Sequence, residues 1–280
     1  MGAAPMIPPL ALGLCDDASV FPPGLMPLAD ALPAHRVHRA APYADAVGLL
    51  VLPATALDDL PVTEPIDVAL TAPGGPIQAW EVLTRGSGMP LRLRALEVAV
   101  PDDMTPARFF RELGDPPVTV YVEIPRDARG PEFIKALMFE GHRAKFRTGG
   151  VTGALYPSPD ELAGMVKAAV DAGVAFKATA GLHHAVRNTD PPTGFEQHGF
   201  LNLLLATAAA LDDAPVTRIT HILADRDASA VAARVADLPA DRIRAVRGRF
   251  LSFGTCSVLE PLTELADLGL LPLKLLENDT

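Results

Sequence analysis

The strongest constraint on the fold is an alternation between short apolar runs and longer amphipathic segments. Nine runs combine apolar and β-branched residues over strand-like lengths, and they span 10–15, 47–52, 66–71, 91–100, 118–124, 143–148, 174–180, 219–223 and 249–254. Segments with helical spacing separate most of these runs. Strands that alternate with helices of about 10 to 15 residues form parallel sheets. The alternation therefore predicts an α/β fold.

Two of the intervening segments carry clear helix starts. At 158–161 the order Ser-Pro-Asp-Glu places a capping serine, a proline suited to the first helical position and a glutamate that completes a capping box. Apolar residues at helical spacing then continue over 160–172. A Thr-Pro pair at 105–106 opens a second helix in the same way.

The number of strands within this chain length favours a closed barrel. Eight or nine strands in 280 residues fit a single (β/α)8 TIM barrel over 1–280. We assign 249–254 as the eighth strand and place 219–223 in an insertion that covers roughly 183–247. A doubly wound open sheet is the alternative, but it favours a Gly-rich phosphate loop, and the sequence has neither G-x-G-x-x-G nor a Walker motif.

Charge and composition limit the classes of partner. The 34 acidic residues exceed the 24 basic ones, and no basic stripe of the kind found in nucleic-acid binders is visible. The longest apolar stretches, 46–57 and 199–211, are interrupted and too short for a membrane span. The amino terminus lacks a basic signal-peptide region, and only Cys15 and Cys256 are present. We expect a cytoplasmic protein with a small-molecule substrate and no nucleic-acid or membrane partner; a homo-oligomer stays open.

Ionisable residues occur late in four consecutive predicted strands. Strand side chains alternate between the two faces of a sheet, so Lys145 and Arg147 share one face, and Lys177 shares a face with Thr179. Late strand positions of a parallel barrel converge at its carboxyl-terminal mouth, where active sites form. The pattern predicts a cluster there of Glu97, Glu123, Lys145, Arg147 and Lys177. The alternative is that some of these residues point outward or form buried ion pairs without chemistry.

The region AKFRTGGVTGALYPSPDELAGMVKAAVDAGVAFKATAGLHH resembles the paired-lysine region of the deoxyribose-phosphate aldolase family. Lys145 stands in the place of the Schiff-base lysine and Lys177 in that of the second lysine. VTVYVEIP places Glu123 where the family's preceding strand ends in a glutamate, and RALEVAVP places Glu97 at the catalytic aspartate. The resemblance covers roughly 91–182, plus 249–257, where RFLSFGTCS is similar to the last strand and its Gly-Thr-Ser-Ser phosphate loop.

The resemblance implies a lysine-dependent, aldolase-like lyase that acts on a small, anionic carbonyl compound and needs no cofactor. An imine forms from a neutral amine, and we expect the cations of Arg147 and Lys177 to lower the pKa of Lys145. Glu97 or Glu123 would then move protons through a water. The expected substrate-binding residues are Arg147, Thr179, His183, His184, Asp17, Gly254, Thr255 and Ser257.

Two other functions stay open at this level. A metal-dependent barrel enzyme could bind a divalent cation through His183, His184 and His198, although neither H-E-x-x-H nor Cys-x-x-Cys is present. A non-catalytic barrel could instead keep the lysines to hold an anionic ligand. A turn is likewise the alternative to a substrate contact for Asp17, because Asp, Ser, Pro and Gly around it favour turns.

Overall fold

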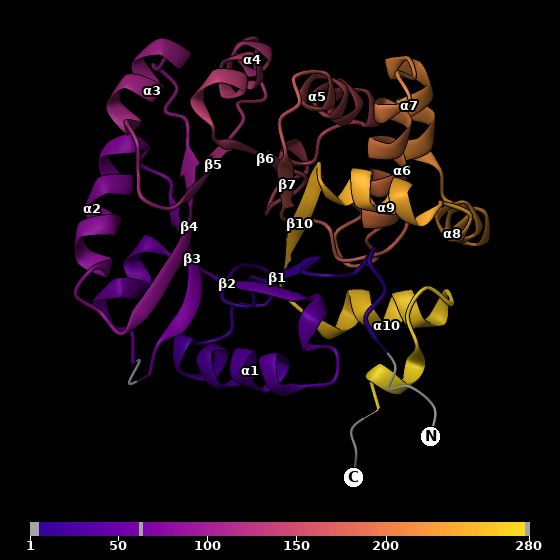
Figure 1. Ribbon diagram of the computed structural model, residues 1–280, viewed down its shortest axis with the longest axis horizontal. Helices are drawn as coiled ribbons and strands as arrows, with labels where there is room; N and C mark the ends of the chain where they lie inside the picture. Colours follow the sequence, from indigo (N-terminus) through magenta and orange to yellow (C-terminus); the bar gives the residue numbers. More distant parts are fainter. Residues whose placement is uncertain (1–5, 62–63, 278–280) are drawn as a thin grey trace.

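The predicted closed barrel is confirmed. The computed structural model describes residues 6–61 and 64–277. Its eight parallel strands close into one barrel (Figure 1), which in spatial order contains β1 (Cys15–Asp17), β10 (Phe250–Thr255), β7 (Phe176–Thr179), β6 (Arg143–Arg147), β5 (Thr119–Glu123), β4 (Leu91–Ala99), β3 (Ile66–Ala72) and β2 (Val47–Pro53).

Helices follow most strands and cover the outside of the barrel (Figure 1). They are α1 (Leu28–Ala40), α2 (Pro76–Gly86), α3 (Pro106–Leu113), α4 (Gly130–Glu140), α5 (Pro159–Asp171), α6 (Phe200–Leu211), α7 (Val216–Ala224), α8 (Ala228–Ala236), α9 (Ala240–Arg247) and α10 (Leu259–Asp267). A short 3-10 segment, Ala54–Asp58, takes the place of a helix between β2 and β3. None of the helices in the described residues combines the length and the apolar character that a membrane crossing requires.

Both predicted helix starts are present. At the start of α5, the Ser158 hydroxyl accepts a hydrogen bond from the Glu161 amide at 3.2 Å, and the Glu161 carboxylate accepts one from the Ser158 amide at 2.6 Å. At the start of α3, the Thr105 hydroxyl accepts a hydrogen bond from the amide of Arg108 at 3.4 Å. These contacts satisfy amide groups that have no partner inside the helix.

The insertion before the last strand is confirmed, but 219–223 is not a strand. A two-stranded antiparallel hairpin, β8 (Asn188–Thr189) and β9 (Glu196–Gln197), and then α6 to α9 lie between β7 and β10. The run 219–223 belongs to α7, where Ile219 and Leu223 are four residues apart and both buried. This spacing places them on one face of a helix. The first run differs too, since residues 10–13 form turns and β1 begins only at Cys15.

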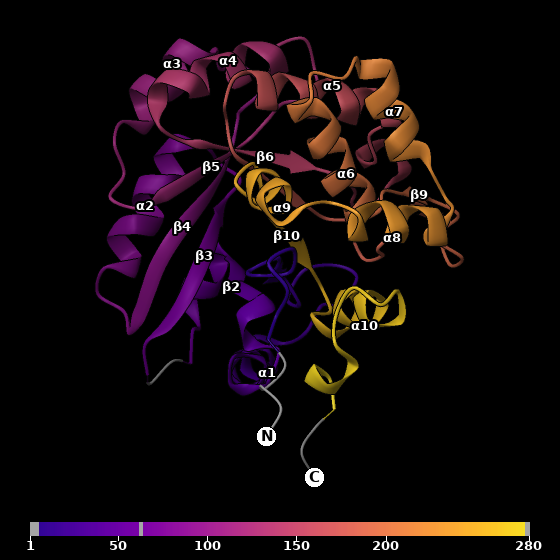
Figure 2. The same ribbon diagram turned by 45° about the vertical axis from the view of Figure 1, so that its right-hand side comes forward.

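Helix α6 explains the long apolar stretch over 199–211. Ten of its twelve residues are buried, because α5, β10 and the outer helices α7, α8 and α9 all pack around it. In Figure 2, α6, α7 and α8 lie together on the right-hand side of the barrel, and α9 lies nearer the centre of the view. A helix that is apolar on all sides is stable in such a buried position. Asn202 carries the one side-chain amide of α6, and this amide donates hydrogen bonds to the carbonyls of Ile222 and Asp225 at the end of α7.

The interior of the barrel is divided between a small apolar cluster and a group of charged side chains. Val51, Ala69, Ala95 and Tyr121 form the cluster, separate from the large core between the strands and the helices. Alanine side chains fill little of the interior. Other inward positions of β1, β4, β5, β6 and β7 carry the charged residues described next.

Candidate functional site

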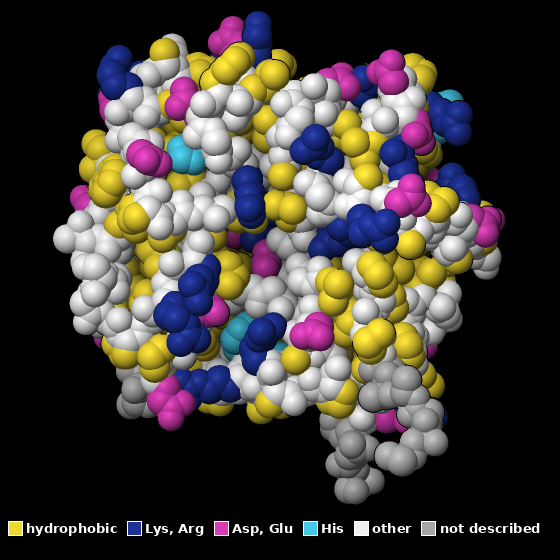
Figure 3. Space-filling view, viewed as in Figure 1, with side chains coloured by type: hydrophobic (Ala, Val, Ile, Leu, Met, Phe, Trp, Pro, Cys, Tyr) yellow, Lys and Arg dark blue, Asp and Glu magenta, His cyan; other side chains and the backbone are white. Residues whose placement is uncertain are grey.

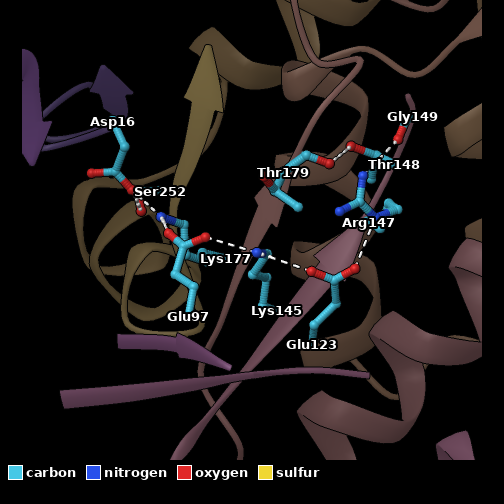
Figure 4. A network of polar contacts seen from close by, with 10 residues as sticks. All are labelled: Asp16, Glu97, Glu123, Lys145, Arg147, Thr148, Gly149, Lys177, Thr179 and Ser252. Carbon is cyan, nitrogen blue, oxygen red and sulfur yellow. Dashed lines mark hydrogen bonds and ion pairs between the residues drawn. The ribbon is translucent and has the colours of Figure 1, made fainter. Parts of the chain in front are cut away.

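Six charged side chains form an alternating chain of ion pairs across the barrel interior (Figure 4). In order they are Asp16, Lys177, Glu97, Lys145, Glu123 and Arg147. Lys177 on β7 reaches Glu97 on β4 and Asp16 on β1, and neither strand is next to β7. These contacts can form only through the interior of the barrel, so the structure brings together all five residues of the predicted cluster.

Glu97 lies in the middle of this chain of ion pairs and contacts both lysines. Its Oε1 accepts a hydrogen bond from Lys177 Nζ at 2.6 Å, and its Oε2 lies 2.8 Å from Lys145 Nζ. The carboxylate is 2% exposed. Burial alone would raise the pKa of Glu97, but the ammonium groups of Lys145 and Lys177 outweigh burial and hold this pKa at about 2.

The ammonium group of Lys145 lies between two carboxylates. Its Nζ lies 2.8 Å from Glu97 Oε2 and 3.0 Å from Glu123 Oε2. Burial alone would lower the pKa of Lys145, but Glu123 and Glu97 raise it above its ordinary value. The expected lowering by Arg147 and Lys177 is therefore wrong, because the carboxylates of Glu123 and Glu97 lie between Lys145 and these two cations.

Glu123 and Arg147 form one end of the chain of ion pairs, and they lie at the carboxyl ends of β5 and β6. Arg147 Nε donates a hydrogen bond to Glu123 Oε1 at 2.8 Å, while the other oxygen of Glu123 faces Lys145. Burial would raise the pKa of Glu123, but Lys145 and Arg147 hold it at about 2. The Arg147 side chain is 35% exposed, so the chain of ion pairs meets solvent at this end.

Asp16 lies at the other end of the chain of ion pairs and is not among the site residues predicted from the sequence. Its Oδ2 accepts hydrogen bonds from Lys177 Nζ at 2.6 Å and from Ser252 Oγ at 2.7 Å, and its Oδ1 accepts one from the Leu49 amide at 2.9 Å. Asp16 and Glu97 outweigh burial and raise the pKa of Lys177. Neighbouring strand positions face opposite ways, so only one of the two consecutive aspartates on β1 can enter the barrel.

Asp17, the aspartate that the sequence predicts as a substrate contact, pairs with His35 and with neither of the two lysines. It is buried, its Oδ2 is 3.0 Å from His35 Nδ1, and its Oδ1 accepts a hydrogen bond from the Ser19 amide at 3.1 Å. Burial would raise the pKa of Asp17, but the bonds from His35 and Ser19 lower it below its ordinary value. Its partners are those of a structural contact between β1 and α1.

Three of the predicted anion-binding residues lie at the carboxyl ends of adjacent strands, and Arg147 on β6 pairs in register with Thr179 on β7. Thr179 ends β7, and it pairs in register with Gly254 on β10. The hydroxyl of Thr255 bonds to the backbone of Ser257 within the turn after β10. In the part of the chain that the structure describes, no hydrogen bond or ion pair joins Arg147 to the turn over 254–257.

The three candidate histidine ligands have separate partners. His183 Nδ1 lies 3.4 Å from Cys256 Sγ, and His184 Nδ1 lies 2.6 Å from Glu264 Oε1. His198 is fully buried and donates from Nε2 to the Pro157 carbonyl at 2.8 Å; burial lowers its pKa to about 4. Over residues 6–61 and 64–277, no three His, Cys, Asp or Glu side chains gather as a metal site would require.

A cavity of about 540 Å³ leads to the chain of ion pairs from the amino ends of the strands. Asp16, Lys177 and Ser252 line its inner part. Its mouth is lined by residues at the starts of four strands, namely Val47, Ile66, Arg92 and Arg143. Figure 3 shows a hollow in the middle of one face with Lys and Arg side chains around it. From the sequence, the site is expected only at the carboxyl ends of the strands.

Comparisons of the chain with models of protein families, with curated proteins and with solved structures found no match.

Proposed function

We propose that the protein is a lysine-dependent, aldolase-like lyase that forms a Schiff base with a small, anionic carbonyl compound. The observation that carries the proposal is the pairing of two buried lysines around one carboxylate. Lys145 and Lys177 occupy the same register position on adjacent strands, and the two oxygens of Glu97 each contact one of them. Buried, closely coupled titratable groups beside a cavity are typical of catalytic sites.

Lys145 is the proposed nucleophile, as the resemblance implies. Its ammonium group must first lose a proton to solvent, and Glu123 and Glu97, 3.0 Å and 2.8 Å away, are placed to relay that proton. The free amine then attacks the carbonyl carbon, and loss of water leaves an imine, which accepts electrons from the neighbouring carbon–carbon bond. Lys177, on the other oxygen of Glu97, is the proposed source of the proton that the departing hydroxyl group needs.

Reductive trapping tests this chemistry. The protein is incubated with glyceraldehyde 3-phosphate, glyoxylate or pyruvate in the presence of borohydride, and its intact mass is measured. Reduction of an imine leaves a stable adduct that adds the mass of the carbonyl compound less one oxygen atom. We expect one adduct per chain in the wild-type protein and none in Lys145→Arg.

The matched control is Lys135→Arg, which changes an exposed lysine on α4 and should leave the adduct unchanged. Circular dichroism establishes that each variant is folded. Locating the adducts in the wild-type protein gives a result that does not depend on the folding of any variant, because every lysine is present. Adducts spread over several surface lysines, with none on Lys145 or Lys177, would overturn the proposed function.

An anion-binding barrel without covalent chemistry is the second candidate. The observation that favours it is the raised pKa of both Lys145 and Lys177, because protonated lysines attract anions but do not form imines. Binding of glyoxylate without any trapped adduct, at neutral and alkaline pH alike, would support this candidate over the lyase.

A further inference from the structure

The cavity at the amino ends of the strands is basic, although the protein as a whole is acidic. The chain carries a formal net charge of −10. Five cationic side chains line the cavity against two carboxylates, the cations being Arg36, Arg39, Arg92, Arg143 and Lys177, and the carboxylates Asp16 and Asp67. Clefts lined by one sign of charge concentrate ligands of the opposite sign. The cavity therefore favours an anion.

Two of these arginines have no carboxylate partner among the described residues. Arg143 donates from Nη1 to the Tyr121 hydroxyl at 3.0 Å, and its guanidinium lies over the Tyr121 ring at 5.5 Å. Arg39 donates from Nη1 to the carbonyls of Ala44 and Val47 at 2.9 Å and 2.7 Å. A guanidinium has five N–H donors, so each arginine keeps further N–H groups for a ligand. The hydrogen bonds just described hold both guanidinium groups in place.

The other cations of the cavity are already paired. Lys177 contacts Asp16 and Glu97, and Arg92 contacts Asp67. Arg36 lies 3.6 Å from the exposed carboxylate of Glu64. The uncompensated charge therefore resides on Arg39 and Arg143, and two positive charges match the charge of a phosphate monoester near neutral pH.

We propose that this cavity binds a small phosphate monoester, whose phosphate contacts Arg39 and Arg143 and whose organic part extends toward Ser252 and Lys177. The apolar side chains of Leu49, Ala69 and Ala95 line the same cavity and leave room for a short carbon chain. Ligands of this size bury most of their surface in cavities of a few hundred Å³. The site does not depend on imine formation, and it places ligand entry at the amino-terminal end of the barrel.

Calorimetric titration with glycerol 3-phosphate tests the site separately from the proposed reaction, because this ligand has no carbonyl group and forms no imine. We expect binding to the wild-type protein that Arg143→Gln weakens at least about tenfold. Arg143→Lys keeps the charge but loses the planar fork of donors, so its affinity should lie between the two. Glycerol, which lacks the phosphate, should not bind.

The matched control is Arg218→Gln, which removes an exposed arginine on α7, outside the cavity. Equal loss of affinity in Arg143→Gln and Arg218→Gln would mean that only the overall charge matters, and it would overturn the site. Absence of binding to the wild-type protein would overturn it as well. A crystal soaked with glycerol 3-phosphate gives a second readout, since phosphate density away from Arg39 and Arg143 contradicts the proposal.

Discussion

At the scale of single residues, the positions of the carboxylates determine the charge state of the lysines. Lys145 has two carboxylates within 3.0 Å and its pKa is raised, so the amine is protonated at neutral pH. A sequence shows which cations are close along a strand, but the carboxylates that face Lys145 come from β4 and β5. The sign of the pKa shift was therefore beyond prediction from the strand of Lys145 alone.

Changing Glu123 tests this arrangement directly. Glu123→Gln removes one of the two negative charges that raise the pKa of Lys145, so this pKa should fall. The neutral amine is then populated at lower pH, and the profile of imine trapping against pH should shift to lower pH. The measurement is the trapping rate across neutral and alkaline pH. The control is Glu132→Gln, which changes an exposed glutamate on α4. An unchanged pH profile in Glu123→Gln would show that Glu123 does not raise the pKa of Lys145.

Gly48 is required by the close approach of Asp16. A Cβ at this position would lie 2.0 Å from Asp16 Oδ1, so the carboxylate would have to leave its contacts with the Leu49 amide and Lys177. We expect Gly48→Ala to lower the free energy of unfolding by roughly 1–3 kcal/mol. Urea unfolding measures the change. Gly88→Ala is the control, since a Cβ at Gly88 meets nothing within 4 Å. An equal loss of stability in both variants would show that the contact with Asp16 is not the cause.

At the scale of elements, local sequence signals predicted helix α5 well and α7 poorly. The capping box at 158–161 depends only on neighbouring residues, and it forms as predicted. The run 219–223 is short and β-branched, which suits a strand, but it continues into a longer helical face that packs on α5 and α6. Tertiary packing outweighs β-propensity in such a short segment.

Ser158→Ala should destabilise the protein through α5. The substitution removes the hydroxyl that accepts from the Glu161 amide, and lost caps of this kind cost about 1 kcal/mol. Thermal or urea unfolding measures the cost. Ser158→Asp keeps a side-chain acceptor at the same position and should restore most of the stability. A full loss in the aspartate variant would show that the cap is not the cause.

At the scale of the whole molecule, the alternation of runs was enough to predict a closed barrel, but not which of its ends opens into a cavity. Active sites of such barrels lie at the carboxyl ends. Here a cavity lined by Ala69 and Ala95 extends toward the amino ends, and arginines from α1, β4 and β6 line it too. Arg39, Arg92 and Arg143 are far apart in the sequence, so no local motif could indicate that they line one cavity.

The chain of ion pairs makes the barrel sensitive to acid. Lys145 and a second cation, Lys177 or Arg147, hold the pKa values of Glu97 and Glu123 at about 2, below the ordinary value of 4.5. Carboxylates with lowered pKa values stabilise the fold fully above the ordinary value, and this stabilisation is lost as the pH falls from 4.5 toward 2. We expect the free energy of unfolding to fall across this window.

Urea unfolding at several acidic pH values measures this dependence. Glu97→Gln removes one of the titrating groups, so its stability should be lower at neutral pH but should change less between about pH 5 and about pH 3. Glu132→Gln should keep the slope of the wild-type protein. An equally steep slope in Glu97→Gln would show that other groups control the acid transition.

The proposed lyase chemistry requires a carbonyl compound to attach to one particular lysine. The most direct measurement is the location of the borohydride-reduced adduct by peptide mass spectrometry of the wild-type protein, with every lysine in competition. The proposed lyase predicts the adduct on Lys145, the buried lysine between Glu97 and Glu123. An adduct on exposed lysines such as Lys135, with Lys145 and Lys177 unmodified, would contradict it.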